Sequence, residues 1–398
     1  MKAAAGTAGD VLPRGDAVLA AAYRLVRQRS EALAAPLSAE DQNIQSMPDA
    51  SPTKWHLAHT TWFFEAVVLA KFARGYEPFD PAYNYLFNSY YEGLGARHPR
   101  PQRGMLSRPQ VGEIMAYRRH VDAAMESLIA SGAPEAAALI TLGLHHEQQH
   151  QELMLTDIKH AFFGNPLMPA YGSTRELPAA VAEDLSWSHH LGGLVEIGHD
   201  GPGFAFDNES PRHKVFLHPF RIANRPVSNA EYLAFIDDGG YRRPEFWLSD
   251  GWAMVQREAI SAPLYWIEDA SGWRVFTLAG VQPLGAAEPV THVSFYEAAA
   301  YAAWAGARLP TEFEWEAANP SAQGAVWEWT RSSYDPYPGF KPFAGEAAEY
   351  NGKFMVSQLV LRGFSRATPP GHARPTYRNF FPPSARWQFS GIRLAGDL

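Results

Sequence analysis

The sequence predicts a chain of two parts, a bundle of long α-helices followed by an irregular α+β domain. Its 398 residues exceed the length of an ordinary single domain, and 46% hydrophobic with 19% charged residues indicates a globular protein. Apolar residues recur at steps of three and four over roughly the first 165 residues, as in amphipathic helices. From Gly192 onward the chain is instead rich in Gly, Pro and Trp between short strand-like runs.

The first two helices are predicted from apolar periodicity and from residues that favour helix starts. One helix begins at Asp16 and continues through "DAVLAAAYRLVRQRSEALAA". The other contains "KWHLAHTTWFFEAVVLAKF", where Ser51 is suited to the cap and Pro52 to the first helical position.

Two further helices follow and complete a four-helix bundle. The third is expected after Ser107 as cap, with Pro109 close behind it, and stops at Gly132. The fourth begins near Pro134, carries "LHHEQQHQE", and ends at Gly164. The interior of such a bundle is a common place for a metal site built from facing side chains.

The second part has a different character, which sets the expected domain boundaries. Residues 1–166 form the bundle, residues 167–190 a linker, and residues 191–398 the α+β domain. The runs "GLVEIG", "HKVFLHPFRIA" and "QLVLRGF" predict strands, and only "SNAEYLAFIDDG" and "SFYEAAAYAAWAG" predict short helices.

Composition excludes several classes of protein and site. The chain contains no cysteine, so a metal would be held by histidine, carboxylate or water. A net charge of −8 without basic clusters argues against a nucleic-acid surface. No apolar run approaches the ~20 residues of a membrane span, and the N-terminus lacks the apolar core of a secretory signal, so a cytoplasmic protein is expected. The oligomeric state is not predicted.

Three histidines predict a metal site in the bundle. His146 and His150 lie one turn apart on the fourth helix, so they face the same way. His59 lies among aromatic residues of the second helix and should point inward, where its ring nitrogens need a partner. Hydrogen-bonded core histidines are the competing interpretation, which the grouping of three disfavours.

The segment "HEQQH" also matches the zinc-protease pattern, in which Glu147 would be the general base. One extension of that pattern requires histidine at position 156, where Thr156 stands. Glu176 and Glu183 remain as alternative ligands, but both lie in the polar linker. The protease interpretation is therefore disfavoured.

Several long motifs, in order, resemble the ergothioneine-biosynthesis sulfoxide synthases. They are "QSMPDASPTKWHLAHTTWFFE", "FNSYYEGLGARHPRPQRG", "HHEQQHQE", "DNESPRHKV", "RLPTEFEWEAA", "VWEWTRS" and "YRNFFPPSARWQFSGIRLA". The resemblance covers nearly the whole chain. It implies a DinB-like helical domain followed by a domain similar to formylglycine-generating enzyme, which has a C-type-lectin-like fold.

The resemblance implies a non-haem iron site and the substrates that meet there. Fe(II) would be bound by His59, His146 and His150, leaving positions for hercynine (Nα-trimethylhistidine), a sulfur substrate and O2. Members of the family form a C–S bond at C2 of the hercynine imidazole. Coordination lowers the pKa of a thiol and holds both reactants beside activated oxygen.

The resemblance also assigns residues outside the metal site. Tyr90 and Tyr91 are the expected catalytic residues, since a phenol can donate a proton during oxygen chemistry. Arg100 and Arg103 resemble the pair that binds the carboxylate of the sulfur substrate. Gln149 is expected to contact the hercynine imidazole.

In the second domain, "YRNFF" resembles the segment that lines the hercynine pocket. Asn379, Phe380 and Phe381 are expected there because a quaternary ammonium is bound by aromatic faces and polar oxygens rather than by ordinary hydrogen bonds. Trp327 and Trp329 are expected to be packing residues.

The chalcogen donor is left open. In the family, the segment that holds Phe364 and Arg366 in this chain usually reads Gly-Gly-Ser with a small residue. The segment belongs to the domain that should shape the substrate pocket. The related selenoneine synthases form a C–Se bond from a selenosugar, and this interpretation stands about even with C–S formation. Two alternatives are a zinc-dependent thiol S-transferase of the DinB-like type and a non-enzymatic lectin-like binding protein.

Overall fold

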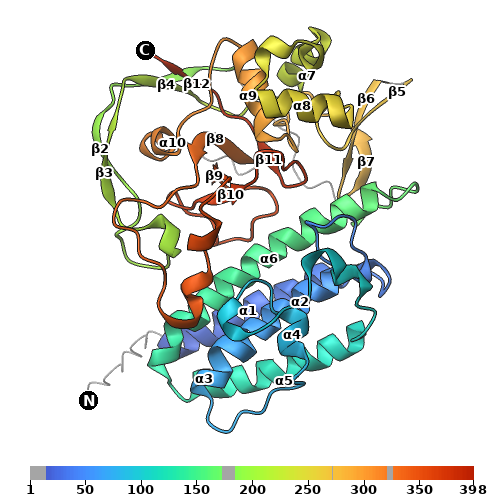
Figure 1. Ribbon diagram of the computed structural model, residues 1–398, viewed down its shortest axis with the longest axis vertical. Coiled ribbons are helices and arrows are strands. Elements are labelled where there is room, and N and C mark those ends of the chain that lie inside the picture. The colour runs from blue at the N-terminus through green and yellow to red at the C-terminus, as the bar shows by residue number, and fades with distance from the viewer. Residues whose placement is uncertain (1–14, 173–183, 271, 321–325) are drawn as a thin grey trace, which may run out of the picture.

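The computed structural model describes residues 15–172, 184–270, 272–320 and 326–398, and it divides into the two expected parts. The helical part contains the blue-to-green helices of Figure 1, and the sheet-containing part packs against one side of it. Helix α6 runs along the boundary between them. The predicted fold class, a helical domain followed by an α+β domain, is confirmed.

The helical part contains α1 (Gly15–Ala34), α2 (Thr53–Phe63), α3 (Ala70–Phe72), α4 (Tyr83–Phe87), α5 (Val111–Ala130) and α6 (Ala137–Phe163). A π-helical stretch (Phe64–Leu69) joins α2 to α3. Short 3₁₀ turns span Asp41–Asn43, Glu92–Leu94, Arg100–Met105 and Pro134–Ala136. The four long helices pack with α1 against α6 and with α2 against both α5 and α6.

Two of the expected helix starts are wrong, and both errors have a physical reason. Pro52 occupies the N-cap position of α2 with no side-chain cap, while the Ser51 N–H donates to Asp157 Oδ2 at 2.8 Å. Helix α5 begins after Gln110 rather than Ser107, and the Glu113 carboxylate accepts the Gln110 N–H at 2.8 Å. The Ser51 hydroxyl accepts Arg103 Nη1–H instead of a helix N–H, and at α5 a capping box of Gln110 and Glu113 takes the place of Ser107.

The expected helix ends are confirmed. Gly132 follows α5 with a positive φ of 71°, a conformation that costs glycine little. Helix α6 ends at Phe163, directly before Gly164.

The second part contains many short elements. Its strands are β1 (Trp187–His190), β2 (Gly193–Ile197), β3 (His213–Leu217), β4 (Phe220–Ala223), β5 (Trp266–Asp269), β6 (Gly272–Thr277), β7 (Gly280–Pro283), β8 (Trp327–Ser333), β9 (Leu359–Gly363), β10 (Asn379–Phe381), β11 (Ser390–Gly391) and β12 (Ala395–Asp397). Its helices are α7 (Asn229–Asp237), α8 (Ser249–Glu258), α9 (Phe295–Trp304) and α10 (Glu312–Ala318). Short 3₁₀ turns span Asp207–Glu209, Gly240–Arg242, Pro244–Phe246, Gly345–Glu349 and Gly352–Phe354.

Helices α7 and α9 are the two expected short helices, and α8 and α10 are additional. The expectation of only two helices is therefore wrong. Strand β1 pairs with β4 although its residues were expected in the linker, so regular structure begins before residue 191.

The sheet that bears on the site has the strand order β10-β9-β8-β11. Strand β10 pairs antiparallel with β9, placing Asn379 opposite Leu361, and β11 runs parallel to β8. The other sheets have the orders β1-β4-β12, β2-β3 and β5-β6-β7. In the part of the chain that the structure describes, no helix is both long and apolar enough to cross a bilayer.

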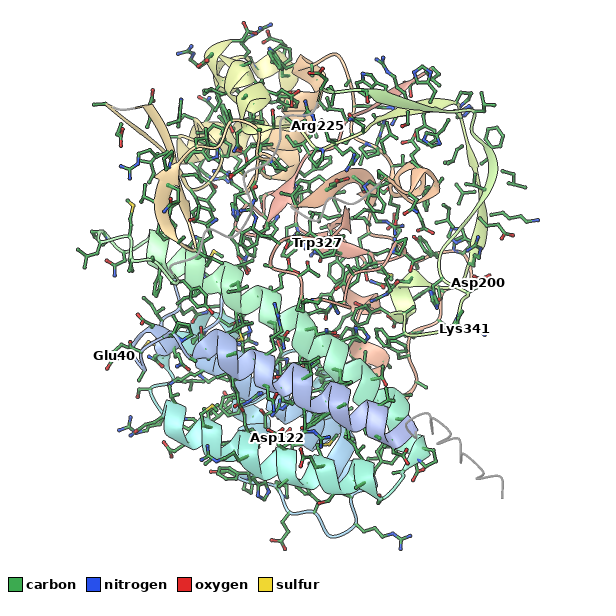
Figure 2. All side chains as sticks on the ribbon, turned by 180° about the vertical axis from the view of Figure 1, so that it is seen from behind. Glu40, Asp122, Asp200, Arg225, Trp327 and Lys341 are labelled. Carbon is green, nitrogen blue, oxygen red and sulfur yellow. The ribbon has the colours of Figure 1, made fainter. Side chains whose placement is uncertain are left out.

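Glu152 of α6 connects the two parts by hydrogen bonds. Its carboxylate accepts Trp327 Nε1–H at 2.7 Å, the Ser365 hydroxyl at 2.6 Å and the Thr368 hydroxyl at 2.8 Å. Figure 2 shows Trp327 where the second part faces α6. Ser365 lies between Phe364 and Arg366, so the segment that departs from the usual family pattern takes part in docking the second domain on α6.

Glu147 anchors the opposite face of α6 within the bundle. Its fully buried carboxylate accepts Arg27 Nη1–H at 2.8 Å, Arg118 Nη2–H at 3.1 Å and the Ser30 hydroxyl at 2.6 Å. Burial alone would raise the pKa of Glu147, but the two arginines outweigh it and lower the pKa. This network ties α1 and α5 to α6.

Replacing Glu147 with Gln should strongly destabilise the protein. The change removes the buried carboxylate that Arg27 and Arg118 share, and breaking a buried ion pair in this way typically costs about 3–5 kcal/mol of the free energy of unfolding. Urea unfolding measures the loss. The matched control is Glu126→Gln, whose exposed pair with Arg24 should matter by less than about 1 kcal/mol. Equal effects of the two substitutions would contradict the assigned role.

Candidate metal centre

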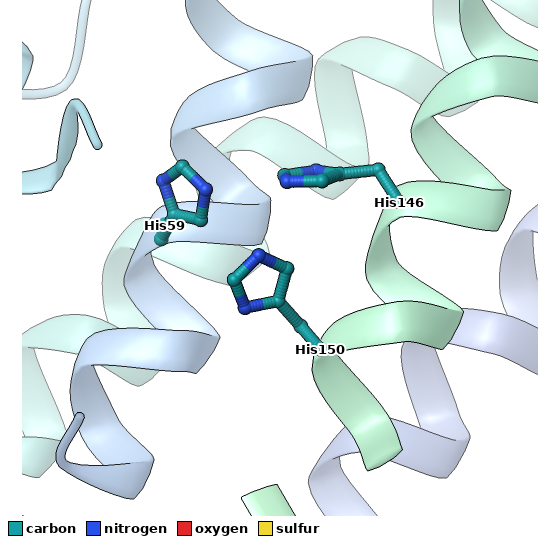
Figure 3. A group of neighbouring side chains, drawn as sticks. All are labelled: His59, His146 and His150. Carbon is teal, nitrogen blue, oxygen red and sulfur yellow. The ribbon is translucent and has the colours of Figure 1, made fainter. Parts of the chain in front are cut away.

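Three histidines converge between α2 and α6. His59 comes from α2, and His146 and His150 come from successive turns of α6. One nitrogen from each ring can be chosen so that the three atoms lie within 4.8 Å of one another. Figure 3 shows the three rings turned toward a common centre. The structure thus brings the three predicted metal ligands together.

Close packing of the two helices places the rings. Gly143 lies one turn before His146, and a Cβ there would approach Phe64 Cε1 to 2.6 Å and Phe63 Cε1 to 2.9 Å. A glycine therefore lets α6 approach α2 at this level. On α2, the His59 ring stacks between Trp55, at 4.6 Å, and Trp62, at 5.6 Å.

Hydrogen bonds leave ring nitrogens available at the centre. His59 Nδ1 lies 2.6 Å from the Phe87 carbonyl oxygen, which can only accept, so Nδ1 carries the proton and Nε2 bears a lone pair. His59 Nε2 and both nitrogens of His146 are buried without a hydrogen-bond partner among the described residues. Unpartnered buried nitrogens are costly in a closed core and are expected where a ligand completes the site.

Electrostatics keep the three rings neutral. Burial is the main cause and lowers the pKa of His146 to about 3, and it lowers the pKa of His59 and His150 well below the usual value. The neighbouring imidazoles lower the last two further. Neutral imidazole is the form that binds metal.

Glu147 does not face this centre. Its carboxylate is occupied by the Arg27, Arg118 and Ser30 donors, so it is not available as the general base of a zinc protease. Glu176 and Glu183, the other carboxylates considered for that interpretation, lie outside the described residues.

Tyr91 contacts Trp62 and Phe63, which in turn contact His59 and His146. The rings of Tyr90 and Tyr91 stack at 4.7 Å, and Tyr91 lies 5.5 Å from Trp62 between ring centroids. The Tyr91 hydroxyl is buried, and the hydroxyl of Tyr90 is its neighbouring polar group. Burial raises the pKa of both phenols, so both remain protonated near neutral pH.

The second domain holds the loop that carries these tyrosines. Glu349 accepts the main-chain N–H groups of Glu92, at 3.1 Å, and Gly93, at 2.8 Å. The Lys353 ammonium donates to the Tyr90 carbonyl oxygen and pairs with Glu349 at 2.6 Å. All of these contacts with the loop are made to its backbone.

Gln149 is held between two tyrosines of the second domain. The Tyr350 hydroxyl donates to Gln149 Oε1 at 2.5 Å, and Gln149 Nε2–H donates to the Tyr377 hydroxyl at 2.7 Å. The Tyr350 ring lies 5.8 Å from the His146 ring. The amide is thus beside the histidines with both ends bonded.

The structure separates the two predicted arginines. Arg100 is exposed and donates to the Asp49 carbonyl oxygen, whereas Arg103 is buried and donates to the hydroxyls of Ser51 and Ser89, each at 2.9 Å. They do not form a paired clamp.

Arg103 lies against the metal-ligand candidates. Its guanidinium carbon is 3.4 Å from the centroid of Trp55, whose ring also stacks on His59. Among the described residues no carboxylate forms an ion pair with it, and burial, followed by Arg100 and Arg97, lowers its pKa well below the usual range. A pocket beside it is lined in part by Lys54, Trp55 and Phe87.

The residues of β10 do not line one common surface. Phe380 stacks on Tyr334 at 4.0 Å and lies 6.0 Å from Phe354, which in turn lies 5.2 Å from Tyr90. Phe381 lies against Trp387 instead, as strand alternation requires.

The Asn379 side chain accepts the Phe380 N–H at 2.9 Å. Trp327 and Trp329 are buried; the indole of Trp327 donates to Glu152 and that of Trp329 to the Val293 carbonyl oxygen. Their packing role is as expected, with the addition that Trp327 bridges the two domains.

Comparisons with known proteins agree with this arrangement. Residues 22–154 match the DinB superfamily, and residues 186–323 and 319–398 match the sulfatase-modifying factor enzyme 1-like domain. The hercynine oxygenase of Mycobacterium tuberculosis is 34% identical over 408 residues, covering 88% of this chain and 92% of that protein. The chain belongs to the hercynine oxygenase family.

Other relatives fit the same assignment. The hercynine oxygenase of Mycolicibacterium smegmatis is 33% identical and covers 89% of this chain and 93% of that protein. The formylglycine-generating enzyme of Streptomyces coelicolor is 36% identical over 149 residues, which is 32% of this chain and 45% of that enzyme. The hercynine oxygenases match most of this chain, whereas the formylglycine-generating enzyme matches only a part of it. This pattern agrees with a fold of two parts.

Sequence reasoning missed four residues that the structure places at the site of this hercynine oxygenase family member. Tyr350 and Tyr377 hold Gln149, His56 contacts His150, and Asp157 is bonded to His56. The spacing of His56 and His59, three residues apart on one helix, was a readable signal. Nothing local marked the two tyrosines, because they approach α6 only through the fold of the second domain.

His146→Leu should abolish stabilisation by metal without destabilising the metal-free protein. The substitution removes two buried unpartnered nitrogens, each a liability of about 1–3 kcal/mol in the metal-free protein. Thermal unfolding with and without anaerobic Fe(II) measures both effects. Metal at about 100 times Kd stabilises a protein by about 2.7 kcal/mol.

His120→Leu, at an exposed position on α5, is the matched control and should keep the metal-dependent shift. A shift that persists in His146→Leu would remove His146 from the metal site.

Proposed function

We propose that this chain is an O2-dependent enzyme that uses Fe(II) bound by His59, His146 and His150 to join a chalcogen donor to C2 of the hercynine imidazole. The observation that carries the proposal is the group of three neutral, buried imidazoles, two of which keep unpartnered nitrogens, in a member of the hercynine oxygenase family. The substrate is inferred from the hercynine oxygenases named above, and the type of reaction is inferred from the residues of the site.

The donor set fits a divalent transition metal. Three neutral nitrogens bind iron without adding negative charge, and imidazole also suits zinc and copper, so the ligands alone do not select iron. Bound there, Fe(II) would supply redox chemistry with O2 and open coordination positions for the substrates.

Gln149 is suited to orient an imidazole. Because Tyr350 and Tyr377 fix both ends of its amide, a substrate beside it meets donor and acceptor groups in one set arrangement. Such preorganisation places a reactant at low entropic cost.

Tyr91 is the better placed of the two tyrosines for proton donation. Its hydroxyl is protonated and buried, and its ring contacts Trp62, whereas Tyr90 stacks on it from the side of the second domain. The role of the pair would be to provide a proton at the reacting donor and steer the reaction toward coupling.

Arg103 supports a donor with a carboxylate. A buried guanidinium with hydroxyl partners alone can gain an anionic partner from a substrate, as in cysteine or γ-glutamylcysteine. A selenosugar would offer hydroxyl groups in place of that anion, and C–Se bond formation remains the alternative to C–S bond formation.

The ammonium of hercynine is expected near Asn379 and Phe380. One face of Phe380 is covered by Tyr334, so its edge and the neighbouring Phe354 are the surfaces left for the cation. The position of Phe381 beside Trp387 gives no support to its inclusion.

Iron-loaded protein given hercynine, O2 and one donor at a time should form a new product linked at C2. Cysteine, γ-glutamylcysteine and a selenosugar are compared side by side by mass spectrometry, and the donor that reacts identifies the branch. Zinc-loaded protein without O2 is the control for thiol S-transfer. Hercynine bound unchanged with every donor would leave only the binding-protein interpretation.

Replacing both Tyr90 and Tyr91 with Phe should shift turnover from the coupled product to oxidised donor. The substitution removes both hydroxyls and keeps the ring packing, so it tests proton donation alone. The ratio of the two products is measured by mass spectrometry. Tyr85→Phe, on the exposed side of α4, is the control, and an unaltered ratio in the double variant excludes the tyrosines from the reaction.

A further inference from the structure

His56 connects one of the metal-ligand candidates to a buried carboxylate. Its Nδ1 lies 2.8 Å from Nδ1 of His150, and its Nε2 lies 3.0 Å from Oδ2 of Asp157. His56 is 2% exposed and Asp157 6% exposed, so water does not compete for these bonds. The Ser51 N–H, at 2.8 Å, holds the same carboxylate oxygen in place.

The direction of each hydrogen bond follows from the chemistry of the groups. An ionised carboxylate can only accept, so His56 Nε2 carries a proton. If the His56 ring is neutral it carries a single N–H, and its Nδ1 then accepts from His150 Nδ1–H. His150 Nε2 is then left with a lone pair, as His59 Nε2 is through the Phe87 carbonyl oxygen.

We propose that Asp157 and His56 are positioning residues that fix the tautomer and ring orientation of His150 so that its Nε2 faces the metal. This inference rests on the proposed metal site. Outer partners of this kind commonly orient ligand imidazoles and increase their basicity. We call His56 together with Asp157 the relay. It reaches His150 from the side opposite the centre, because His150 Nδ1 is the atom bonded to His56.

A role in orienting His150 explains why polar groups are buried here although their burial costs free energy of folding. Two imidazoles and a carboxylate are buried in a row, and a simple core would place apolar side chains here. Because the series ends at a nitrogen beside His59 and His146, its orientation matters only if that nitrogen binds something. His146 has no comparable partner among the described residues and depends on packing alone.

The test measures metal binding by the full-length, metal-free protein with Co(II) as the probe. The variants are His56→Phe and His56→Leu, which remove the relay, and His56→Gln, whose amide can both accept from His150 and donate to Asp157. His160→Phe is the control, because His160 also lies on α6 but bonds Ser46 instead. Thermal unfolding without metal establishes that each variant is folded.

The relay-removing variants should bind Co(II) roughly 10–100-fold more weakly than wild type, with His56→Gln intermediate and the control unchanged. Proton NMR of the Co(II) protein provides a second readout. Wild type should show slowly exchanging, shifted N–H signals from both His59 and His150, and the His150 signal should be lost in His56→Phe and His56→Leu.

The outcomes separate the inference from the function on which it rests. If wild type binds Co(II) and the relay-removing variants bind equally tightly with both signals retained, the inference is overturned and the metal site stands. If wild type binds no metal, the proposed metal site fails and the inference with it.

Discussion

Helix α6 is shared by both domains, and the candidate site depends on how this one helix is packed. Its residues at helical spacing alternate between two partners: His146, Glu147 and His150 face the bundle, while Gln149 and Glu152 bond to the second domain. Neighbours in sequence thus belong to different surroundings. The histidine group and the residue expected to contact hercynine come together only because both domains close on the same helix.

Two carboxylates of α6 have their hydrogen bonds satisfied, whereas two of the three site histidines do not. Glu147 has a donor for each carboxylate oxygen, and Glu152 receives three hydrogen bonds. By contrast His59 and His146 keep buried ring nitrogens that no described residue satisfies. Unsatisfied groups destabilise a core, and here they belong to rings that face one another, as in a site that receives a ligand.

Much of the bundle and of the histidine group could be predicted because both depend on local spacing. Periodicity located the long helices, and a one-turn interval between His146 and His150 put them on one face. The short elements of the second domain were harder. Helix α10 was missed although Thr311 and Glu314 form a capping box, a signal present in the sequence.

The remaining errors concern contacts between distant segments. Ser51 did not cap its helix, and its hydroxyl accepts Arg103 Nη1–H instead. Arg100 and Arg103 look equivalent in sequence, yet a 3₁₀ turn sends one to solvent and buries the other. Tyr350 and Tyr377 could not be assigned to Gln149 because that contact spans about half of the chain.

Glu349 and Lys353 form hydrogen bonds with the loop that carries Tyr90 and Tyr91, and these bonds affect how such a site can change. Both residues bind main-chain groups, so these bonds to the loop are kept when its side chains change, provided that an aromatic ring still fills the contacts of Tyr90 with Lys353 and Phe354. Substitution at the two tyrosine positions can therefore alter reactivity while the scaffold stays in place. A fold of this kind can diversify its chemistry one side chain at a time.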